Sequence, residues 1–395
     1  MPFSQILPVC VFGAAQALCS ALPSAEPGSG RNGSDTSTWP PHTQCQVAHF
    51  RDYFYTGGHY TRDGESGYVY AEQMYVERLQ PATGVTQQFP LVLMHGQAQT
   101  GTNFLRKPDG GCGWAERFLQ QGYVVYIIDQ TLRGRSAWRP GAAAAAPSTY
   151  SAAIIEQRFT APEKYRLWPQ AARHTQWPGN GSVGDPVFDA FYRANVQFID
   201  DAAYQQATDQ AAGAALLDRI ARPVVLVGHS QGGLLPLLIA DARPRLTQAL
   251  ILLEPTGPPF REAVFGNGSA RPFGLTDVPL TYAPPVTDPA VDLVKEETQP
   301  RPTMDKTACV LQAASPAPRT LINLASKPIL TLTTEASYHA VYDYCTVQYL
   351  RQAGCEKATH LELAEVGVRG NGHMMFMEKN SDEILSLLLQ WIKSV

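Results

Sequence analysis

Residues Val224–Ala240 read VVLVGHSQGGLLPLLIA, and this stretch decides the fold. Val224–Val227 is a short, β-branched-rich apolar run of the kind that a fully buried parallel strand needs. It ends at Gly228–Gly232, and an apolar run typical of a helix begins after Gly233. The glycines two residues on either side of Ser230 allow a turn that is too tight for a Cβ. The stretch therefore predicts a strand, a sharp turn at Ser230 and a helix.

The G-x-S-x-G pattern between a strand and a helix is the nucleophile elbow. We expect Ser230 to adopt a strained conformation that raises its Oγ above the sheet, at the positive end of the following helix. A serine hydroxyl is a poor nucleophile until a base takes its proton. The chemistry therefore requires a histidine and an acid that orients it.

The stretch from about Val76 to the C-terminus resembles the α/β-hydrolase superfamily. Within it, the chain is most similar to microbial secreted serine esterases with a Ser–Glu–His triad, whose Glu follows the strand after the elbow. The resemblance implies an α/β fold with a mostly parallel, doubly wound sheet, N-terminal antiparallel strands and a cap made of insertions. That esterase group carries a vicinal cysteine pair in its oxyanion loop, where this chain has Gln97 and Ala98. The departure leaves open whether the loop is less rigid or is shaped for a different substrate.

The base and the acid of the triad are expected beyond the elbow, because the superfamily order is Ser, acid, His. His373 lies in a Gly-rich loop after the last expected strand and has the position of the base. Two acids compete for the remaining role. Glu254 follows the strand after the elbow in a Leu-Glu-Pro context, whereas Glu335 follows the next strand, the more usual superfamily position. The resemblance to the esterases favours Glu254.

An oxyanion hole is expected beside Ser230. Attack on an ester carbonyl places negative charge on oxygen, and two backbone N–H groups must already point at that position. Gln231, the residue after the nucleophile, offers one of them. The resemblance assigns the other to Gln97, in the His95–Gly101 loop. The alternative for this loop is a Gly-rich turn without a special role.

Alternating apolar strands and helices predict one α/β-hydrolase domain over residues 45–395. Two segments, at about 138–187 and 255–327, interrupt the alternation and are too long to be bare loops. We interpret them as parts of a cap over the elbow, whose aromatic residues line a pocket or simply pack the cap on the core. Strands are expected at 51–60, 68–79, 89–94, 123–129, 224–227, 249–253, 328–333 and 361–366, and helices at 114–121, 188–220, 342–352 and 382–395.

The N-terminus indicates a secreted protein. Residues 1–22 have the apolar core and small-residue end of a signal peptide, but they lack a positive n-region, so a hydrophobic tail remains the alternative. Residues 23–44 are rich in Pro, Gly, Ser and Thr and are expected to be flexible. N-glycosylation sequons begin at Asn32, Asn180 and Asn267.

Cysteine usage agrees with an oxidising compartment. The chain has 7 cysteines, and removal of the signal peptide leaves Cys45, Cys112, Cys309, Cys345 and Cys355. At least one thiol is then free, and the sequence alone does not set the pairing of the others. No Cys/His spacing suggests a metal site.

Charge and hydropathy exclude some partners. Net charge is −4, from 31 basic and 35 acidic residues, and no Lys/Arg cluster occurs. This argues against nucleic acid or an anionic membrane as a partner. Outside the N-terminus, no apolar run reaches the length of a membrane span.

Together these features predict a secreted serine hydrolase that cleaves a carboxylic ester or a lactone through an acyl-enzyme, without a cofactor. A biosynthetic acyl transfer or cyclisation on the same site is the alternative, and a binding protein with an inactive triad is a third reading. The substrate and the oligomeric state, including a dimer, stay open.

Overall fold

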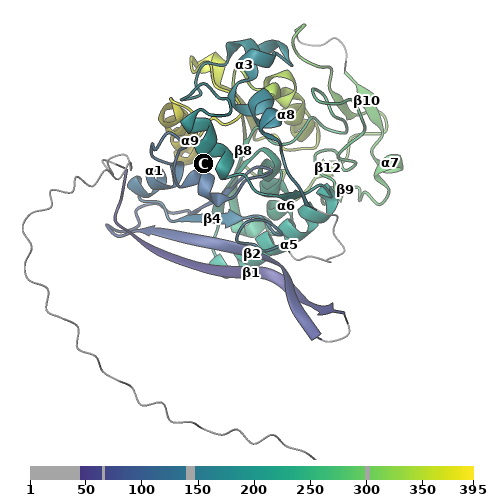
Figure 1. Ribbon diagram of the computed structural model, residues 1–395. Coiled ribbons are helices and arrows are strands. Elements are labelled where there is room, and N and C mark those ends of the chain that lie inside the picture. Colours follow the sequence, from purple (N-terminus) through teal and green to yellow (C-terminus); the bar gives the residue numbers. More distant parts are fainter. Residues whose placement is uncertain (1–44, 65–66, 139–146, 299–302) are drawn as a thin grey trace, which may run out of the picture. The chain divides into compact units, whose positions relative to one another are not determined.

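The computed structural model describes residues 45–64, 67–138, 147–298 and 303–395 (Figure 1). The chain divides into a unit Met1–Pro41 and a unit His42–Val395. The expected signal peptide at 1–22, the expected flexible segment at 23–44 and the Asn32 sequon lie outside the described residues. The described helices and strands all belong to the second unit.

An eight-stranded sheet with the order β1-β2-β4-β3-β7-β8-β13-β14 forms the centre of this unit. The β1–β2 and β2–β4 pairs are antiparallel, and the remaining pairs are parallel. This mostly parallel sheet with antiparallel N-terminal strands confirms the predicted fold class. The strands are β1 His49–Asp63, β2 Gly67–Pro81, β3 Leu91–Met94, β4 Val125–Asp129, β7 Val224–His229, β8 Thr247–Leu253, β13 Ile329–Thr333 and β14 Ala358–Glu362.

Helices cover both faces of the sheet, and short elements fill the two long insertions (Figure 1). The longer helices are α1 Trp114–Gln120, α4 Pro186–Arg193, α5 Ala202–Ile220, α6 Leu235–Ala242, α8 Asp343–Gln352 and α9 Ser381–Ser394. The short ones are η1 Gly101–Phe104, α2 Ala152–Ile155, η2 Glu156–Thr160, α3 Pro162–Tyr165, η3 Pro169–Arg173, η4 Ser230–Gly233, η5 Pro244–Leu246, α7 Pro289–Asp292, η6 Tyr338–Val341 and η7 Leu363–Val366. Small two-stranded pairs join β5 Pro147–Ser148 to β6 Phe198–Ile199, β9 Tyr282–Ala283 to β12 Thr320–Leu321, and β10 Lys295–Glu297 to β11 Val310–Gln312.

The central strand β7 contributes side chains to two separate cores, because successive side chains point to opposite faces of a sheet. Val224 and Leu226 pack in the core that includes residues of α5 and α6, whereas Val225 and Val227 pack in the core with residues of α1 and α9. A strand buried on both faces has to be apolar at every position, which is why its sequence reads as a continuous run.

Two expected elements differ from the structure. The helical pattern at 188–220 is broken after Arg193, and a new helix, α5, begins after Asp201, whose side chain accepts a hydrogen bond from the Tyr204 N–H. An N-cap of this kind starts a helix regardless of the periodicity before it. The last strand lies at Ala358–Glu362 rather than 361–366, since Leu363–Val366 forms a 3₁₀ helix.

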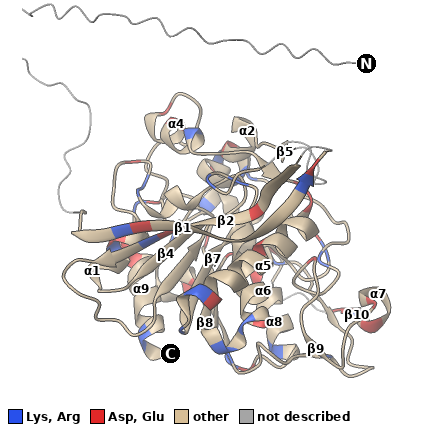
Figure 2. Ribbon diagram, turned by 90° about the horizontal axis from the view of Figure 1, so that it is seen from below, with Lys and Arg blue, Asp and Glu red and all other residues tan. Residues whose placement is uncertain are grey.

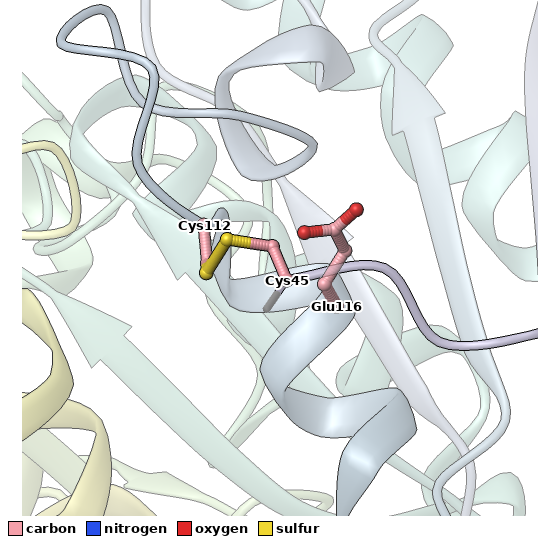
Figure 3. Close-up of side chains that lie close together, drawn as sticks. All are labelled: Cys45, Cys112 and Glu116. Carbon is pink, nitrogen blue, oxygen red and sulfur yellow. A yellow bond between two sulfur atoms is a disulfide. The ribbon is translucent and has the colours of Figure 1, made fainter. Parts of the chain in front are cut away.

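Two disulfides join Cys45 to Cys112 and Cys309 to Cys345, and Cys355 is a buried free thiol. The expected free thiol and pairing are therefore confirmed, and the structure adds the connectivity. Glu116 lies close to the first disulfide (Figure 3). Because the two sulfurs are bonded to each other, this group offers no thiolate to a metal ion.

Lys and Arg are scattered among Asp and Glu over the described chain (Figure 2). None of the helices among the described residues combines the length and the hydropathy needed to cross a bilayer.

Candidate active site

Ser230 directly follows β7 and has a left-handed backbone conformation, with a φ of 58°. A Cβ on Gly228 would lie 2.1 Å from the Gly232 carbonyl oxygen, and a Cβ on Gly232 would lie 2.2 Å from the His95 carbonyl oxygen. Only glycine avoids both clashes, so the G-x-S-x-G spacing follows from the tightness of the turn. A serine held at positive φ is a strained residue of the kind that is found at functional sites.

His373 lies beside Glu254, and both side chains are buried. The Nδ1 atom of His373 is 2.6 Å from Oε2 of Glu254. Glu254 follows β8, and its carboxylate also accepts hydrogen bonds from the Thr334 N–H at 2.8 Å and the Ser337 hydroxyl at 2.7 Å. With donors on both oxygens, this carboxylate is held as an acceptor for Nδ1–H.

The surroundings keep the His373 imidazole neutral. Burial lowers the pKa of His373 well below its usual range, and the neighbouring His339 lowers it further. Burial raises the pKa of Glu254, and the hydrogen bonds from Thr334 and Ser337 oppose that rise. A neutral imidazole with its proton on Nδ1 has a free lone pair on Nε2, which is the state that a general base requires.

The competing acid, Glu335, lies elsewhere. Its Oε1 is 2.9 Å from the Arg369 guanidinium, and its Oε2 accepts a hydrogen bond from the Gly370 N–H at 2.9 Å. Glu335 thus contacts Arg369 and Gly370, which precede His373 in the chain, whereas Glu254 contacts the imidazole itself.

The two loops that carry Gln97 and Gln231 meet beside Ser230. Both residues line the same cavity as Ser230 and His373. Gln231 lies in the first turn of η4, where backbone N–H groups have no acceptor within the helix. The Gln97 side chain accepts a hydrogen bond from the Tyr150 hydroxyl at 2.5 Å. This contact links the loop to the first insertion at the position where the esterases that the chain resembles have a cysteine pair.

Arg133, which the sequence did not single out, connects these two loops. It is fully buried, and it donates to the Gly96 carbonyl oxygen at 3.1 Å and to the Gln231 side chain at 2.9 Å. Burial lowers the pKa of Arg133 to about 10, against the opposing charge of Asp209, so the guanidinium stays charged at neutral pH. One buried side chain therefore contacts both of the loops that carry the expected oxyanion donors.

A second histidine, His339, stacks on the first. The two rings are parallel within 2°, with centroids 4.8 Å apart. The Nδ1 atom of His339 lies 2.8 Å from Asp343 Oδ1, and burial lowers the pKa of His339 to about 4. His339 precedes the last strand, and this position in the sequence gave no sign that it would reach the site.

Glu254, His339 and His373 are close enough together to hold a metal ion. One ring nitrogen of each histidine is already engaged, however. Nδ1 of His373 and Nδ1 of His339 each face a carboxylate, and Glu254 also accepts from Thr334 and Ser337. The three side chains are therefore better arranged to exchange a proton than to coordinate a metal ion.

Tyr338 lies on the Nε2 side of the His373 imidazole. Its hydroxyl lies 3.4 Å from Nε2. Burial raises the pKa of Tyr338 well above its usual value, so the hydroxyl keeps its proton and is available as a donor.

The site opens into a cavity of about 260 Å³. Both segments that were expected to form a cap contribute to its lining: Tyr150, Arg158 and Phe159 come from the first, and Thr256–Gly257 and Glu262–Phe265 come from the second. The sequence indicated that aromatic residues were present here, but not which of them face the cavity.

The loop that carries His373 is anchored by a buried carboxylate, Glu378. This carboxylate accepts hydrogen bonds from the Gly372 N–H at 2.9 Å and the Asn371 amide at 2.7 Å. It also lies 2.8 Å from Nε2 of His174, whose Nδ1 is 3.0 Å from Glu163. Burial lowers the pKa of His174, but the two carboxylates outweigh burial and raise it to about 9. His174 is therefore charged at neutral pH and joins the first insertion to the His373 loop.

We expect this ion pair to make stability depend on pH. Since the folded pKa of His174 exceeds that of a free histidine, its contribution is complete below about pH 6.5 and is lost as the pH rises through about 9. The contribution is at most about 3 kcal/mol. The free energy of unfolding, measured with urea, should fall between pH 6.5 and 9.5 more steeply for the wild type than for His174→Gln. His49→Gln, at an exposed position, is the control, and parallel pH profiles for wild type and His174→Gln would contradict the prediction.

Comparisons with known proteins identify the family of this chain. A family model described as "Alpha/beta hydrolase family" matches residues 91–387. A "Probable secreted lipase phiG" from Fungal sp. (strain ATCC 74256) is 46% identical over 341 residues, which covers 86% of this chain and 89% of that protein. The solved structure "The Atomic Resolution Structure of a Novel Bacterial Esterase" superposes with a TM-score of 0.57 at 21% identity, covering 90% of this chain and 98% of that one. The chain is a hydrolase by fold and relationship, and it belongs to the alpha/beta hydrolase family.

Proposed function

We propose that this protein is a serine hydrolase that cleaves a carboxylic ester, open or cyclic, through an acyl-enzyme. The contact of 2.6 Å between His373 Nδ1 and Glu254 Oε2 carries the proposal, because His373 lines the same cavity as Ser230. The name of the related "Probable secreted lipase" and that of the similar bacterial esterase support an ester as the substrate.

In the proposed reaction, Ser230 Oγ attacks the ester carbonyl while His373 Nε2 takes the hydroxyl proton. Glu254 holds the Nδ1–H and stabilises the imidazolium that forms. The backbone N–H groups of Gln97 and Gln231 bind the oxyanion. Nε2 then returns the proton to the leaving alkoxide, next to which the Tyr338 hydroxyl is placed to donate. Water repeats the sequence on the acyl-enzyme and releases the acid.

The proposal is tested by labelling the protein with a fluorophosphonate and by following hydrolysis of p-nitrophenyl esters of graded acyl length. We expect a covalent adduct on Ser230 and turnover of short esters, since the cavity holds about 260 Å³. An adduct without hydrolysis of any ester or lactone would favour acyl transfer or cyclisation. Absence of an adduct would favour a binding protein.

We also propose that the protein acts outside the cytosol. Two disulfides support this location, since they persist in oxidising compartments. The sequon asparagines Asn180 and Asn267 are exposed, so glycans fit there. Mass spectrometry of the protein from its host should find a mature N-terminus near residue 23, and an intact Met1 would contradict secretion.

A further inference from the structure

Arg158 has an unusual position in the wall of the cavity. It lies in η2, Glu156–Thr160, which is a single turn of π-helix between α2 and α3. Such turns are rare and are found frequently at functional sites, because the extra residue redirects neighbouring side chains. Here Arg158 and Phe159, although adjacent in the chain, both line the cavity. Phe159 also stacks on the His373 ring, with centroids 5.2 Å apart.

The guanidinium of Arg158 is held in place but not neutralised. Its central carbon lies 4.0 Å from the centroid of the Phe265 ring. Stacking of this kind fixes the plane of an arginine and leaves the N–H groups at its edge available. Within the described ranges, Arg158 makes no ion pair and donates no hydrogen bond.

The acids near Arg158 are committed to other partners. Glu156 accepts from the Tyr165 hydroxyl at 2.8 Å and the Val183 N–H at 2.9 Å. Glu262, which also lines the cavity, pairs with Arg271 at 2.7 Å. Among the cavity-lining residues that the structure describes, Arg158 is therefore the cation without a counter-ion.

We propose that Arg158 binds a carboxylate of the substrate, so that the hydrolysed ester or lactone carries a free carboxylate in its acyl or its alcohol part. A planar guanidinium matches a carboxylate with two parallel hydrogen bonds. A single arginine balances one negative charge, which suits a carboxylate better than a doubly charged phosphate. This inference rests on the proposed ester hydrolysis and adds the substrate class to it.

The test compares kcat/KM for matched charged and neutral esters. The acyl arm uses p-nitrophenyl hydrogen glutarate against its neutral methyl ester, and the alcohol arm uses 4-carboxyphenyl acetate against its methyl ester, with the rate of Ser230→Ala subtracted as background. For one or both pairs, Arg158→Gln should lower kcat/KM for the acid by about 10- to 100-fold and for the neutral ester by less than about threefold. Arg158→Lys should recover part of the loss. Arg166→Gln is the matched control, since Arg166 is exposed in the same segment and does not line the cavity.

Equal losses for acid and neutral ester in both arms, or no loss for either acid, would overturn the role of Arg158 while leaving ester hydrolysis standing. If the wild type cleaves neither kind of ester, the proposed reaction is wrong. The binding of carboxylates to the protein then tests the role of Arg158 separately. Calorimetry with glutarate and with benzoate should then detect at least about tenfold weaker binding of one of them to Arg158→Gln than to wild type. Equal binding of both compounds to both proteins would overturn the proposal, and near-ultraviolet circular dichroism checks that the variant is folded.

Discussion

Replacing Ser230 with Ala is expected to lower kcat for ester hydrolysis by roughly 10⁴- to 10⁶-fold. The reason is chemical rather than structural. Alanine keeps the Cβ that the turn at φ 58° already accommodates, so the elbow should form as before. In the proposed reaction, what is lost is the hydroxyl from which His373 would take a proton, and with it the acyl-enzyme. Residual turnover would come from the oxyanion donors and binding alone.

The measurement is steady-state hydrolysis of p-nitrophenyl esters, together with mass spectrometry of fluorophosphonate-treated protein. Ser386→Ala is the control, because Ser386 lies exposed on α9. Wild-type turnover by Ser230→Ala, or an adduct on another serine in that variant, would disprove the assignment of the nucleophile.

Glu254→Gln should lower kcat by about 10⁴-fold with little change in KM, by analogy with the same kind of change in a serine protease triad. Glu254 accepts hydrogen bonds from Thr334 and Ser337 as well as Nδ1–H of His373. An amide cannot accept on both of its atoms. If its NH₂ group faces Nδ1, the imidazole carries its proton on Nε2 and can no longer accept the one from Ser230. The loss should appear in the transition state and therefore in kcat.

Glu335→Gln is the matched control, since it makes the same chemical change at the other acid. Glu335 pairs with Arg369, whose side chain is 63% exposed, and exposed pairs contribute about 0–1 kcal/mol. Its loss should therefore change kcat only a few-fold. A large effect at Glu335 with a mild one at Glu254 would mean that the acid has been assigned to the wrong strand.

Local sequence was sufficient to predict a structural element wherever one short stretch contains all the residues that cause it. Gly228 is required by a contact within the elbow itself, with the Gly232 carbonyl oxygen, and apolar runs reflect strands buried on both faces. The periodic pattern failed where a local polar residue started a new helix. The break between α4 and α5 depends on the cap at Asp201, which a periodic count of apolar residues does not register.

The sequence by itself determined the fold class and the chain order of nucleophile, acids and histidine, because strand, turn and helix signals are local. It left Glu254 and Glu335 as alternatives, because both follow parallel strands whose carboxyl ends meet at the same edge of the sheet. Only the tertiary structure decided which carboxylate lies against His373, since that depends on side-chain direction and on the donors that surround each oxygen. The same holds for Arg133, Arg158 and His339. Each lies far from Ser230 in the chain, and only packing brings Arg158 and His339 to the cavity and Arg133 to the loops of Gln97 and Gln231.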